Sequence, residues 1–192
     1  MAMTKNGFPS AMLEQIHWLS PYLRLPAGGI ADEFPTESDC EDRFLQIRWP
    51  EGPICPVCSK KDFGNLTSEK FYPCRNCKTQ FSDTSGTILH RRRLDLSVYF
   101  RLAAEIVRYE TVRSIPSGHD IKDRFGLAYA TAVRLKKDLT KSLTELDGGL
   151  LGRCICVQDL TCPQDIDLGS DDHLIWLQGE DQRRRWRSHL IE

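Results

Sequence analysis

Two Cys-x-x-Cys pairs constrain this 192-residue chain more than any other feature of its sequence. They lie fifteen residues apart in CPVCSKKDFGNLTSEKFYPCRNC, residues 55–77. A Cys-x-x-Cys turn directs two sulfur atoms at one centre, and a second such turn completes the tetrahedron that a structural zinc ion requires. The spacing falls in the range of zinc ribbons. We therefore predict a zinc ion held by four ligands: Cys55, Cys58, Cys74 and Cys77.

Other uses of these thiols fit the pattern less well. A redox dithiol needs one Cys-x-x-Cys at the start of a helix in a βαβ unit, and a cluster of buried thiols needs no paired spacing. Iron–sulfur ligation stays open in principle, although the two-plus-two arrangement favours zinc. Four thiolates leave no position for water, so we expect the ion to stabilise structure without catalysis.

The remaining cysteines carry a weaker signal. Cys40 is expected to pack on the face of its helix. Cys154, Cys156 and Cys162 could join His173 in a second metal site, but their spacing matches no standard pattern. Because the sequence shows no signal peptide and no apolar run of the roughly 18 residues that a membrane span needs, we expect a cytoplasmic, nucleoid-associated protein with reduced thiols.

The charge of the chain is unevenly distributed. The formal net charge is only -1, yet residues 55–141 hold 17 Lys and Arg against 9 Asp and Glu, whereas residues 142–182 hold 1 against 9. A basic middle between acidic flanks is typical of a nucleic-acid-binding module inside a neutral protein. Ordinary solvated surface charge is the alternative.

Helical patterns surround the cysteine-rich segment. Ser10 is expected to cap a first helix that stops at Pro21 and is followed by a linker over residues 23–35. Ser38 and Glu41 have the spacing of a capping box and open the next helix. Residues 153–158 and 173–178 have the composition of two strands.

The segment from Asp95 to Gly149 has the pattern of two helices joined by a turn. A stripe of apolar residues over 99–107 predicts a helix that ends before Pro116. A short helix near 120–125, a turn at Gly126 and a long basic helix follow. The apolar stripe of the long helix is Ala132, Leu135, Leu139, Leu143 and Leu146. This is the helix-turn-helix pattern, although a three-helix bundle without DNA binding would show the same stripes.

Three stretches carry a resemblance to a known family: RWPEGPICPVC, YPCRNCKTQFSDTSGTILH and GLAYATAVRLKKDL. Residues 38–143 resemble the amino-terminal part of the ISXO-type insertion-sequence transposases. The resemblance implies a zinc ribbon and a helical DNA-binding segment, followed in that family by a DDE catalytic domain. Ser59 stands where the family usually has Gly, which is acceptable if Ser59 lies outside a left-handed turn.

We expect no counterpart of that catalytic domain in this sequence. Two-metal phosphoryl transfer needs three converging carboxylates on a domain of about 150 residues, and 43 residues follow Gly149. Asp159 could be a relic of the first catalytic strand. We therefore expect no catalytic residues and no enzymatic activity.

Basic and polar residues in two places are predicted to contact double-stranded DNA. The arginine run after the ribbon is suited to contact phosphates. On the long helix, the residues of the first two turns are suited to contact base edges, and the lysines further along are suited to contact phosphates. The predicted set is Arg91, Arg92, Arg93, Tyr129, Thr131, Arg134, Lys136, Lys137 and Lys141. A solvated linker is the alternative for the arginine run. The RRRWR segment, residues 183–187, could bind DNA or pair with the acidic residues 159–181 and thereby screen the DNA-binding face.

These observations predict an α+β fold in four parts. Residues 1–37 form a helix and linker, 38–90 a capped helix and zinc ribbon, 91–149 the helical DNA-binding domain, and 150–192 an acidic extension with a basic end. We expect a sequence-directed DNA-binding protein that regulates transcription. A protein-interaction adaptor and a non-catalytic transposase remnant are the alternatives, with a protein partner on the acidic extension or a homodimer as further expectations.

Overall fold

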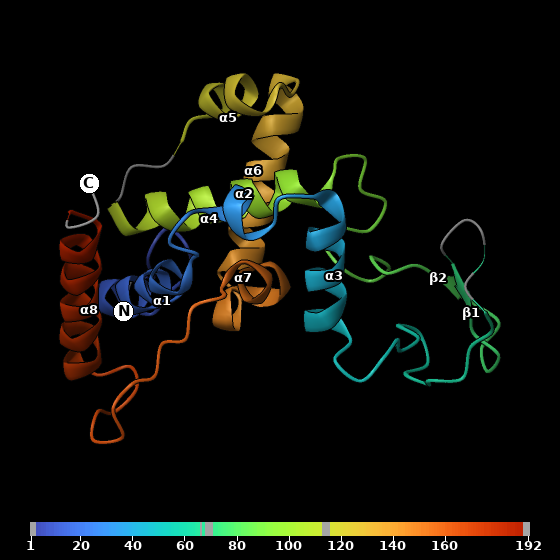
Figure 1. Ribbon diagram of the computed structural model, residues 1–192, viewed down its shortest axis with the longest axis horizontal. Helices are drawn as coiled ribbons and strands as arrows, with labels where there is room; N and C mark the ends of the chain where they lie inside the picture. Colours follow the sequence, from blue (N-terminus) through green and yellow to red (C-terminus); the bar gives the residue numbers. More distant parts are fainter. Residues whose placement is uncertain (1–2, 66, 68–70, 113–115, 190–192) are drawn as a thin grey trace.

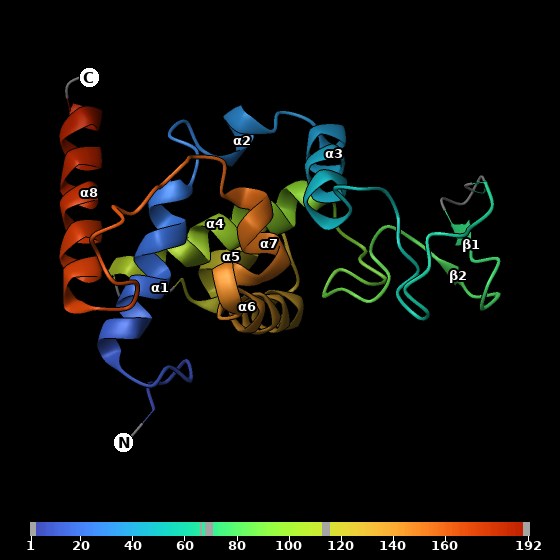
Figure 2. The same ribbon diagram turned by 90° about the horizontal axis from the view of Figure 1, so that it is seen from below.

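The computed structural model describes residues 3–65, 67, 71–112 and 116–189. A helical bundle forms one part of the molecule and a small two-stranded unit projects from its far end (Figures 1 and 2). The elements are α1 (Ala11–Arg24), α2 (Ile30–Glu33), α3 (Glu37–Arg48), β1 (Tyr72–Pro73), β2 (Gln80–Phe81), α4 (Leu96–Val112), α5 (Gly118–Phe125), α6 (Tyr129–Leu143), the 3-10 turn η1 (Leu146–Gly148), α7 (Gly149–Ile155) and α8 (Asp171–His189). The predicted α+β class is confirmed.

Helix α4 is the centre of the bundle. Its apolar stripe is buried as the sequence predicts, and α1, α2, α3, α6 and α7 pack around it. A helix covered on several sides needs a wide apolar face, which the residues from Tyr99 to Val107 supply. The described residues contain no helix long and apolar enough to cross a membrane.

The first helix does not stop at Pro21, so that prediction is wrong. Ser10 caps α1 as expected, but the helix continues to Arg24 with Pro21 inside it. The carbonyl oxygens at its end accept hydrogen bonds from Arg184 of α8, at 2.7 Å for Tyr22 and 3.0 Å for Leu25. A distant guanidinium thus satisfies groups that a helix end leaves open.

The segment predicted as a linker belongs to the core. Leu25, Ile30 and Phe34 are buried against α4, and the ring of Phe34 meets that of Phe100 edge-on at 5.6 Å. The described part of residues 1–37 therefore shares one core with the later helices through Trp18, Leu25, Ile30 and Phe34. The short helix α2 has only four residues, too few to show a sequence period.

The capping box of α3 lies two residues before the predicted one. Thr36 accepts a hydrogen bond from the backbone N–H of Asp39, and the Asp39 carboxylate accepts one from the Thr36 N–H. The predicted pair Ser38 and Glu41 is therefore wrong. Ser38 lies inside the first turn, and Glu41 forms an ion pair with Arg92 instead.

Helices α5 and α6 form the predicted pair with a tight turn. Ser117 caps α5, and Gly126 ends it with φ 64°, a left-handed conformation that glycine adopts without strain. A Cβ at Gly118 would lie 2.6 Å from Val133, so this glycine permits the close approach of the two helices. The stripe of α6 is buried through Leu143, but Leu146 is wrongly included, because it lies in η1 and is 86% exposed.

Neither predicted strand forms. Residues 153–155 end α7 and residues 156–158 follow it, residues 173–178 lie in α8, and no strand forms within 149–189. Short apolar runs do not distinguish a buried strand from a buried helix. Asp159 follows α7 as an exposed residue, so it does not end a strand.

Candidate metal centre and nucleic-acid interface

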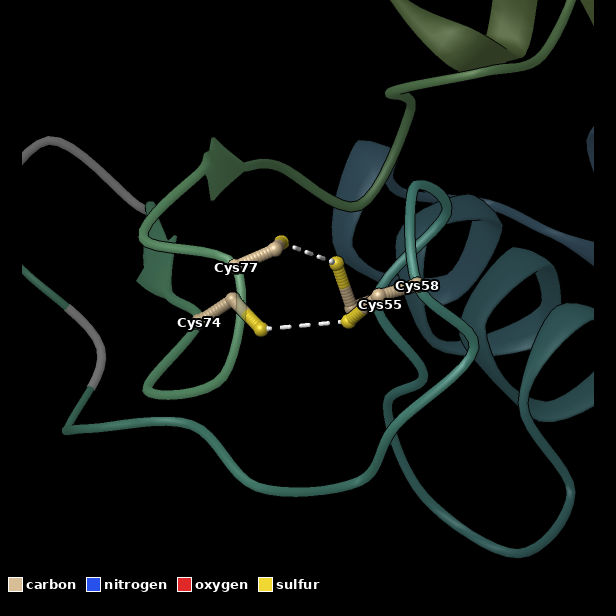
Figure 3. Close-up of side chains that lie close together, drawn as sticks. All are labelled: Cys55, Cys58, Cys74 and Cys77. Carbon is tan, nitrogen blue, oxygen red and sulfur yellow. Dashed lines mark hydrogen bonds between the residues drawn. The ribbon is translucent and has the colours of Figure 1, made fainter.

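The four predicted cysteine ligands converge on one point (Figure 3). The sulfur atoms of Cys55, Cys58, Cys74 and Cys77 all lie within 4.8 Å of one another. The Sγ–Sγ distances are 3.6 Å for Cys55 and Cys77 and 3.5 Å for Cys58 and Cys74. A tetrahedral zinc ion with Zn–S bonds near 2.3 Å needs sulfur atoms about 3.8 Å apart. The residues therefore fit a four-thiolate metal site, and these distances are far longer than a disulfide bond.

Both cysteine turns have the same backbone hydrogen bonds. The N–H of Ser59 donates to Cys55 O at 2.9 Å, and the N–H of Lys78 donates to Cys74 O at 3.0 Å. In each turn the residue after the second cysteine is left-handed, with φ 57° at Ser59 and 62° at Lys78. The sequence-based condition that Ser59 lies outside a left-handed turn is thus wrong, and the chain carries strain where glycine would carry none.

Hydrogen bonds at the turns favour the thiolate form of two ligands. The Thr79 hydroxyl and its backbone N–H lower the pKa of Cys77 to about 6. The backbone N–H of Lys60 lowers the pKa of Cys58. Thiolates are the metal-binding form of cysteine, so the backbone prepares these sulfur atoms for a cation.

An aromatic cluster supports the metal centre from one side. Phe81 of β2 stacks on Tyr72 of β1 with ring centroids 5.4 Å apart, and Trp49 and Phe63 meet these rings edge-on. The two strands pair antiparallel, with Tyr72 opposite Phe81. Rings in such arrangements add packing energy beyond the area they bury. The sequence analysis identified the ligands but not this small core.

The comparisons with known proteins agree with this centre. Residues 35–80 match the transposase zinc-ribbon domain family of the IS1595 type. The cysteine-rich unit is a transposase-type zinc ribbon. An uncharacterized protein in transposable element ISH50 of Halobacterium salinarum is 24% identical over 119 residues. That alignment covers 60% of this chain and 40% of the length of the relative. No solved structure matches the chain at a significant level.

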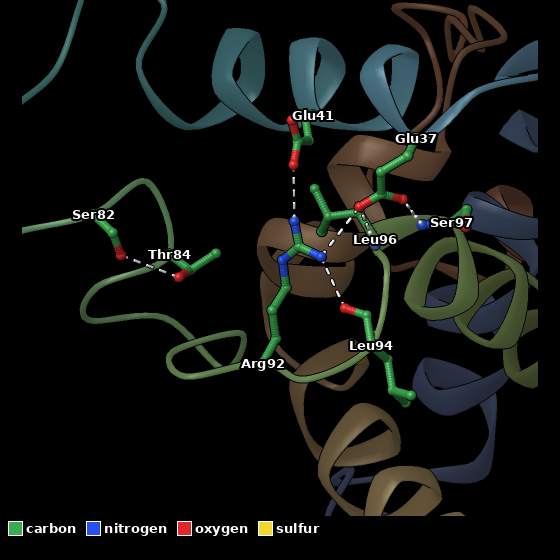
Figure 4. A network of polar contacts seen from close by, with 8 residues as sticks. All are labelled: Glu37, Glu41, Ser82, Thr84, Arg92, Leu94, Leu96 and Ser97. Carbon is green, nitrogen blue, oxygen red and sulfur yellow. Dashed lines mark hydrogen bonds and ion pairs between the residues drawn. The ribbon is translucent and has the colours of Figure 1, made fainter. Parts of the chain in front are cut away.

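Arg92 joins the zinc ribbon to the bundle (Figure 4). Its guanidinium lies 3.1 Å from a carboxylate oxygen of Glu37 and 3.1 Å from one of Glu41, and its side chain is 17% exposed. Glu37 also accepts hydrogen bonds from the first N–H groups of α4, at 2.7 Å from Leu96 and 3.0 Å from Ser97. One glutamate thus caps α4 and fixes Arg92, which has a structural role rather than a free surface for phosphate.

A second arginine also connects the ribbon to α3. The Arg48 guanidinium lies over the Trp49 ring at 4.5 Å and donates to the carbonyl of Ser85. Burial lowers the pKa of Arg48, with the nearby Asp83 opposing that effect. Neither Arg48 nor Glu37 has a sequence signal that sets it apart from other charged residues on α3.

The other two arginines of the predicted run are exposed. Arg91 lies in a left-handed conformation, φ 59°, and Arg93 precedes α4 by a few residues. Neither forms an ion pair within the part of the chain that the structure describes. They remain available to an anion near the junction of ribbon and bundle.

The predicted contacts on α6 separate into two groups. Arg134, Lys137 and Lys141 are exposed on the side opposite the buried stripe. Tyr129 is half exposed, and its ring lies tilted by 31° against that of His119, with centroids 4.5 Å apart. The remaining two lie nearer the core. Lys136 donates to the carbonyl of Pro116 at 2.7 Å and so holds the start of α5, and Thr131 is partly buried.

The alternative second metal site does not form. Cys154 and Cys156 are buried in the bundle core, and His173 accepts a hydrogen bond from the N–H of Gly169 at 3.1 Å. Among the described residues, the ribbon cysteines are the group of three or more potential ligands that lies close enough for a metal.

The RRRWR segment is part of α8 and does not screen α6. Helix α8 packs on α1, at the end of the molecule opposite the ribbon (Figure 2). Arg183 and Arg185 pair with Glu180 and Asp181 of the same helix. Two of its arginines therefore pair with acidic residues of their own helix, and the segment lies away from α6, so the structure gives no support to the predicted self-inhibition.

Proposed function

We propose that this chain binds double-stranded DNA in a sequence-directed manner and regulates transcription. The observation that carries the proposal is the exposed basic face of α6, formed by Arg134, Lys137 and Lys141. A short helix, a left-handed glycine and a longer basic helix are the parts of a helix-turn-helix, which places its second helix in the major groove. The match of residues 35–80 to a transposase zinc ribbon supports the same conclusion.

The α6 side chains would contact different parts of the DNA according to their position along the helix. Arg134 lies in the second turn, where recognition helices reach base edges, and its guanidinium can donate two hydrogen bonds to one guanine. Tyr129 lies at the start of the helix beside it. Lys137 and Lys141 lie further along and suit phosphates, as do Arg91 and Arg93.

We infer that the metal is zinc and that its role is structural. Four thiolates in a closed tetrahedron favour zinc and leave no site for a reacting water. Binding of such an ion supplies folding free energy on the order of 10 kcal/mol. Elemental analysis of the purified chain should find about one zinc per molecule. Loss of zinc from a Cys74→Ser variant, with unchanged helical circular dichroism from the bundle, is the expected result.

We also propose that the residues described here act by binding and not by chemistry. A two-metal nuclease needs carboxylates that converge on its ions. Glu180 and Asp181 pair with arginines of their own helix, and the acidic side chains described after α6 form no group of three that lies close enough to hold a metal. A supercoiled plasmid incubated with the chain and Mg²⁺ or Mn²⁺ should stay intact, and nicking above that of a Cys74→Ser control would contradict this.

The DNA proposal is tested by selection followed by equilibrium binding. Sequences enriched from a random duplex library would be measured by fluorescence anisotropy over a range of salt concentrations. Arg134→Ala should weaken binding to the selected sequence by about 1–3 kcal/mol and relax specificity at one position. Lys137→Ala should weaken binding to all DNA sequences alike, and it should reduce the slope of the logarithm of the binding constant against the logarithm of the salt concentration by about 1.

Arg153→Ala is the matched control, because Arg153 is also an exposed arginine on a helix of the bundle but lies on α7. It should bind as the unchanged protein does. No enrichment, or binding that is insensitive to salt, would contradict the proposal. Stoichiometric recovery of a protein and no nucleic acid at moderate salt would instead favour the adaptor function.

A further inference from the structure

A groove lies between the N-terminal segment and the later turns of α6, beside Glu110 of α4. Its volume is about 460 Å³. Four lysines line it, one from the N-terminal segment and three from α6: Lys5, Lys136, Lys137 and Lys141. Four lysines against the one glutamate give the groove a net charge of +3. A concave surface with this charge attracts an anion.

The turn that carries Lys5 is fixed to the bundle. The side-chain amide of Asn6 donates to Glu14 of α1 at 2.5 Å and to Glu110 of α4 at 3.4 Å. One residue thus connects the N-terminal segment to two helices. Lys5 is therefore held beside α6, although it precedes the first helix of the chain.

The carboxylate of Glu110 lies deeper in the groove than the lysines. Only 3% of its side chain is exposed, against 61% for Lys5, whose ammonium group lies 3.7 Å from a carboxylate oxygen of Glu110. Lys137 and Lys141 are also exposed. An anion that enters the groove from solvent therefore meets the ammonium groups before it meets the carboxylate.

Some polar groups of the groove have no partner in the part of the chain that the structure describes. The hydroxyl group of Thr140 is buried there without a hydrogen bond. Lys137 and Lys141 form no ion pair with a carboxylate of the described residues. Because buried hydroxyl groups in folded proteins usually have a hydrogen-bond partner, the Thr140 hydroxyl indicates that a ligand supplies one.

We propose that this groove holds a phosphodiester group of the DNA backbone and that Lys5 is a phosphate contact outside α6. The inference rests on the proposed DNA-binding function and extends its surface to the N-terminal segment. Lys137 and Lys141 follow Arg134 by three and seven residues, so the three side chains share one face of α6. A duplex with α6 in its major groove therefore brings the adjacent backbone over the lysines.

Fluorescence anisotropy over a range of salt concentrations, with the selected duplex, tests the contact. Lys5→Ala weakens binding to all DNA sequences alike, and it reduces the slope of the logarithm of the binding constant against the logarithm of the salt concentration by about 1, because one phosphate contact is lost. Arg108→Ala is the matched control. It removes the same charge from an exposed position on α4, two residues before Glu110 and hence on another side of that helix, and it leaves the slope unchanged.

A photocrosslink separates direct contact from a long-range effect of charge. Lys5→p-benzoylphenylalanine forms a covalent adduct with the selected duplex under ultraviolet light. Arg108→p-benzoylphenylalanine, at the control position, forms none.

An unchanged slope for Lys5→Ala, or no adduct at position 5, overturns this inference. The proposed function stands in that case if Arg134→Ala still relaxes specificity. Binding of inorganic phosphate that calorimetry detects in the unchanged chain and not in Lys5→Ala, with the DNA slope unaltered, assigns the groove to a free anion and overturns the inference as well. A chain that binds no duplex overturns both the proposed function and this extension of it.

Discussion

Replacement of Ser59 by glycine should strengthen metal binding. Ser59 has φ 57°, in a region where a side chain costs about 1–2 kcal/mol and glycine costs nothing. Glycine also makes the unfolded chain more flexible, which lowers the stability of the folded ribbon by about 0.4–1 kcal/mol. The net gain is about 0.5–1 kcal/mol. Because zinc binds the folded ribbon, the dissociation constant should fall by about 2–5-fold.

The assay is a competition titration with a chromophoric zinc chelator. Lys60→Gly is the matched control, because Lys60 is the adjacent residue in the same turn and is not among the residues with positive φ. Glycine there adds flexibility to the unfolded chain without relieving strain, so it should weaken zinc binding by a similar factor. If Ser59→Gly weakens binding as Lys60→Gly does, the strain at Ser59 does not limit the ribbon and the reasoning fails.

Three further predictions follow from buried groups of the bundle. Arg92→Ala should lower the free energy of unfolding in urea by about 1–3 kcal/mol because it removes the guanidinium that pairs with both Glu37 and Glu41, whereas Arg93→Ala should change it by less than about 0.5 kcal/mol. Burial lowers the pKa of His17, so the unfolded chain binds a proton at this side chain more readily than the folded chain does. The free energy of unfolding should therefore fall as the pH drops below about 6.5. In urea titrations from about pH 7.5 to 5.5, His17→Gln should make the free energy of unfolding depend less on pH. Burial raises the pKa of Cys154 to about 12, so peptide mass spectrometry after iodoacetamide treatment at pH 8 should find Cys162 alkylated well before Cys154, and equal rates would contradict the buried position.

Local chemistry made the metal centre and several helices predictable. Two cysteines separated by two residues can meet one ion only in a tight turn, so the spacing of Cys55 and Cys58 implies the turn before any tertiary contact forms. The stripe on α4 and the glycine after α5 are equally local, because a period of 3.6 residues and a left-handed stop are properties of a few neighbouring residues. The class α+β follows from these parts.

Predictions failed where a distant residue decided the outcome. Pro21 is a helix-ending signal by itself, but Arg184, more than 160 residues later, satisfies the end of α1 and the helix continues. The apolar run at 173–178 suits a strand or a helix equally, and α1 provides the surface against which it packs as a helix. The sequence around Arg92 suggests a phosphate contact, but Glu37, which lies 55 residues earlier, is 3.1 Å from its guanidinium in the structure.

The sequence by itself determined the four metal ligands and the order of ribbon, central helix and paired helices, because each depends on spacing within one or two turns of chain. Only the tertiary structure decided which charged residues are free. Glu37 and Arg92 are far apart in the sequence, and an ion pair depends on distance in space, which spacing along the chain does not set. The exposed basic face of α6 is likewise decided by the tertiary structure, because the core that buries the opposite stripe of this helix is built from residues far away in the sequence.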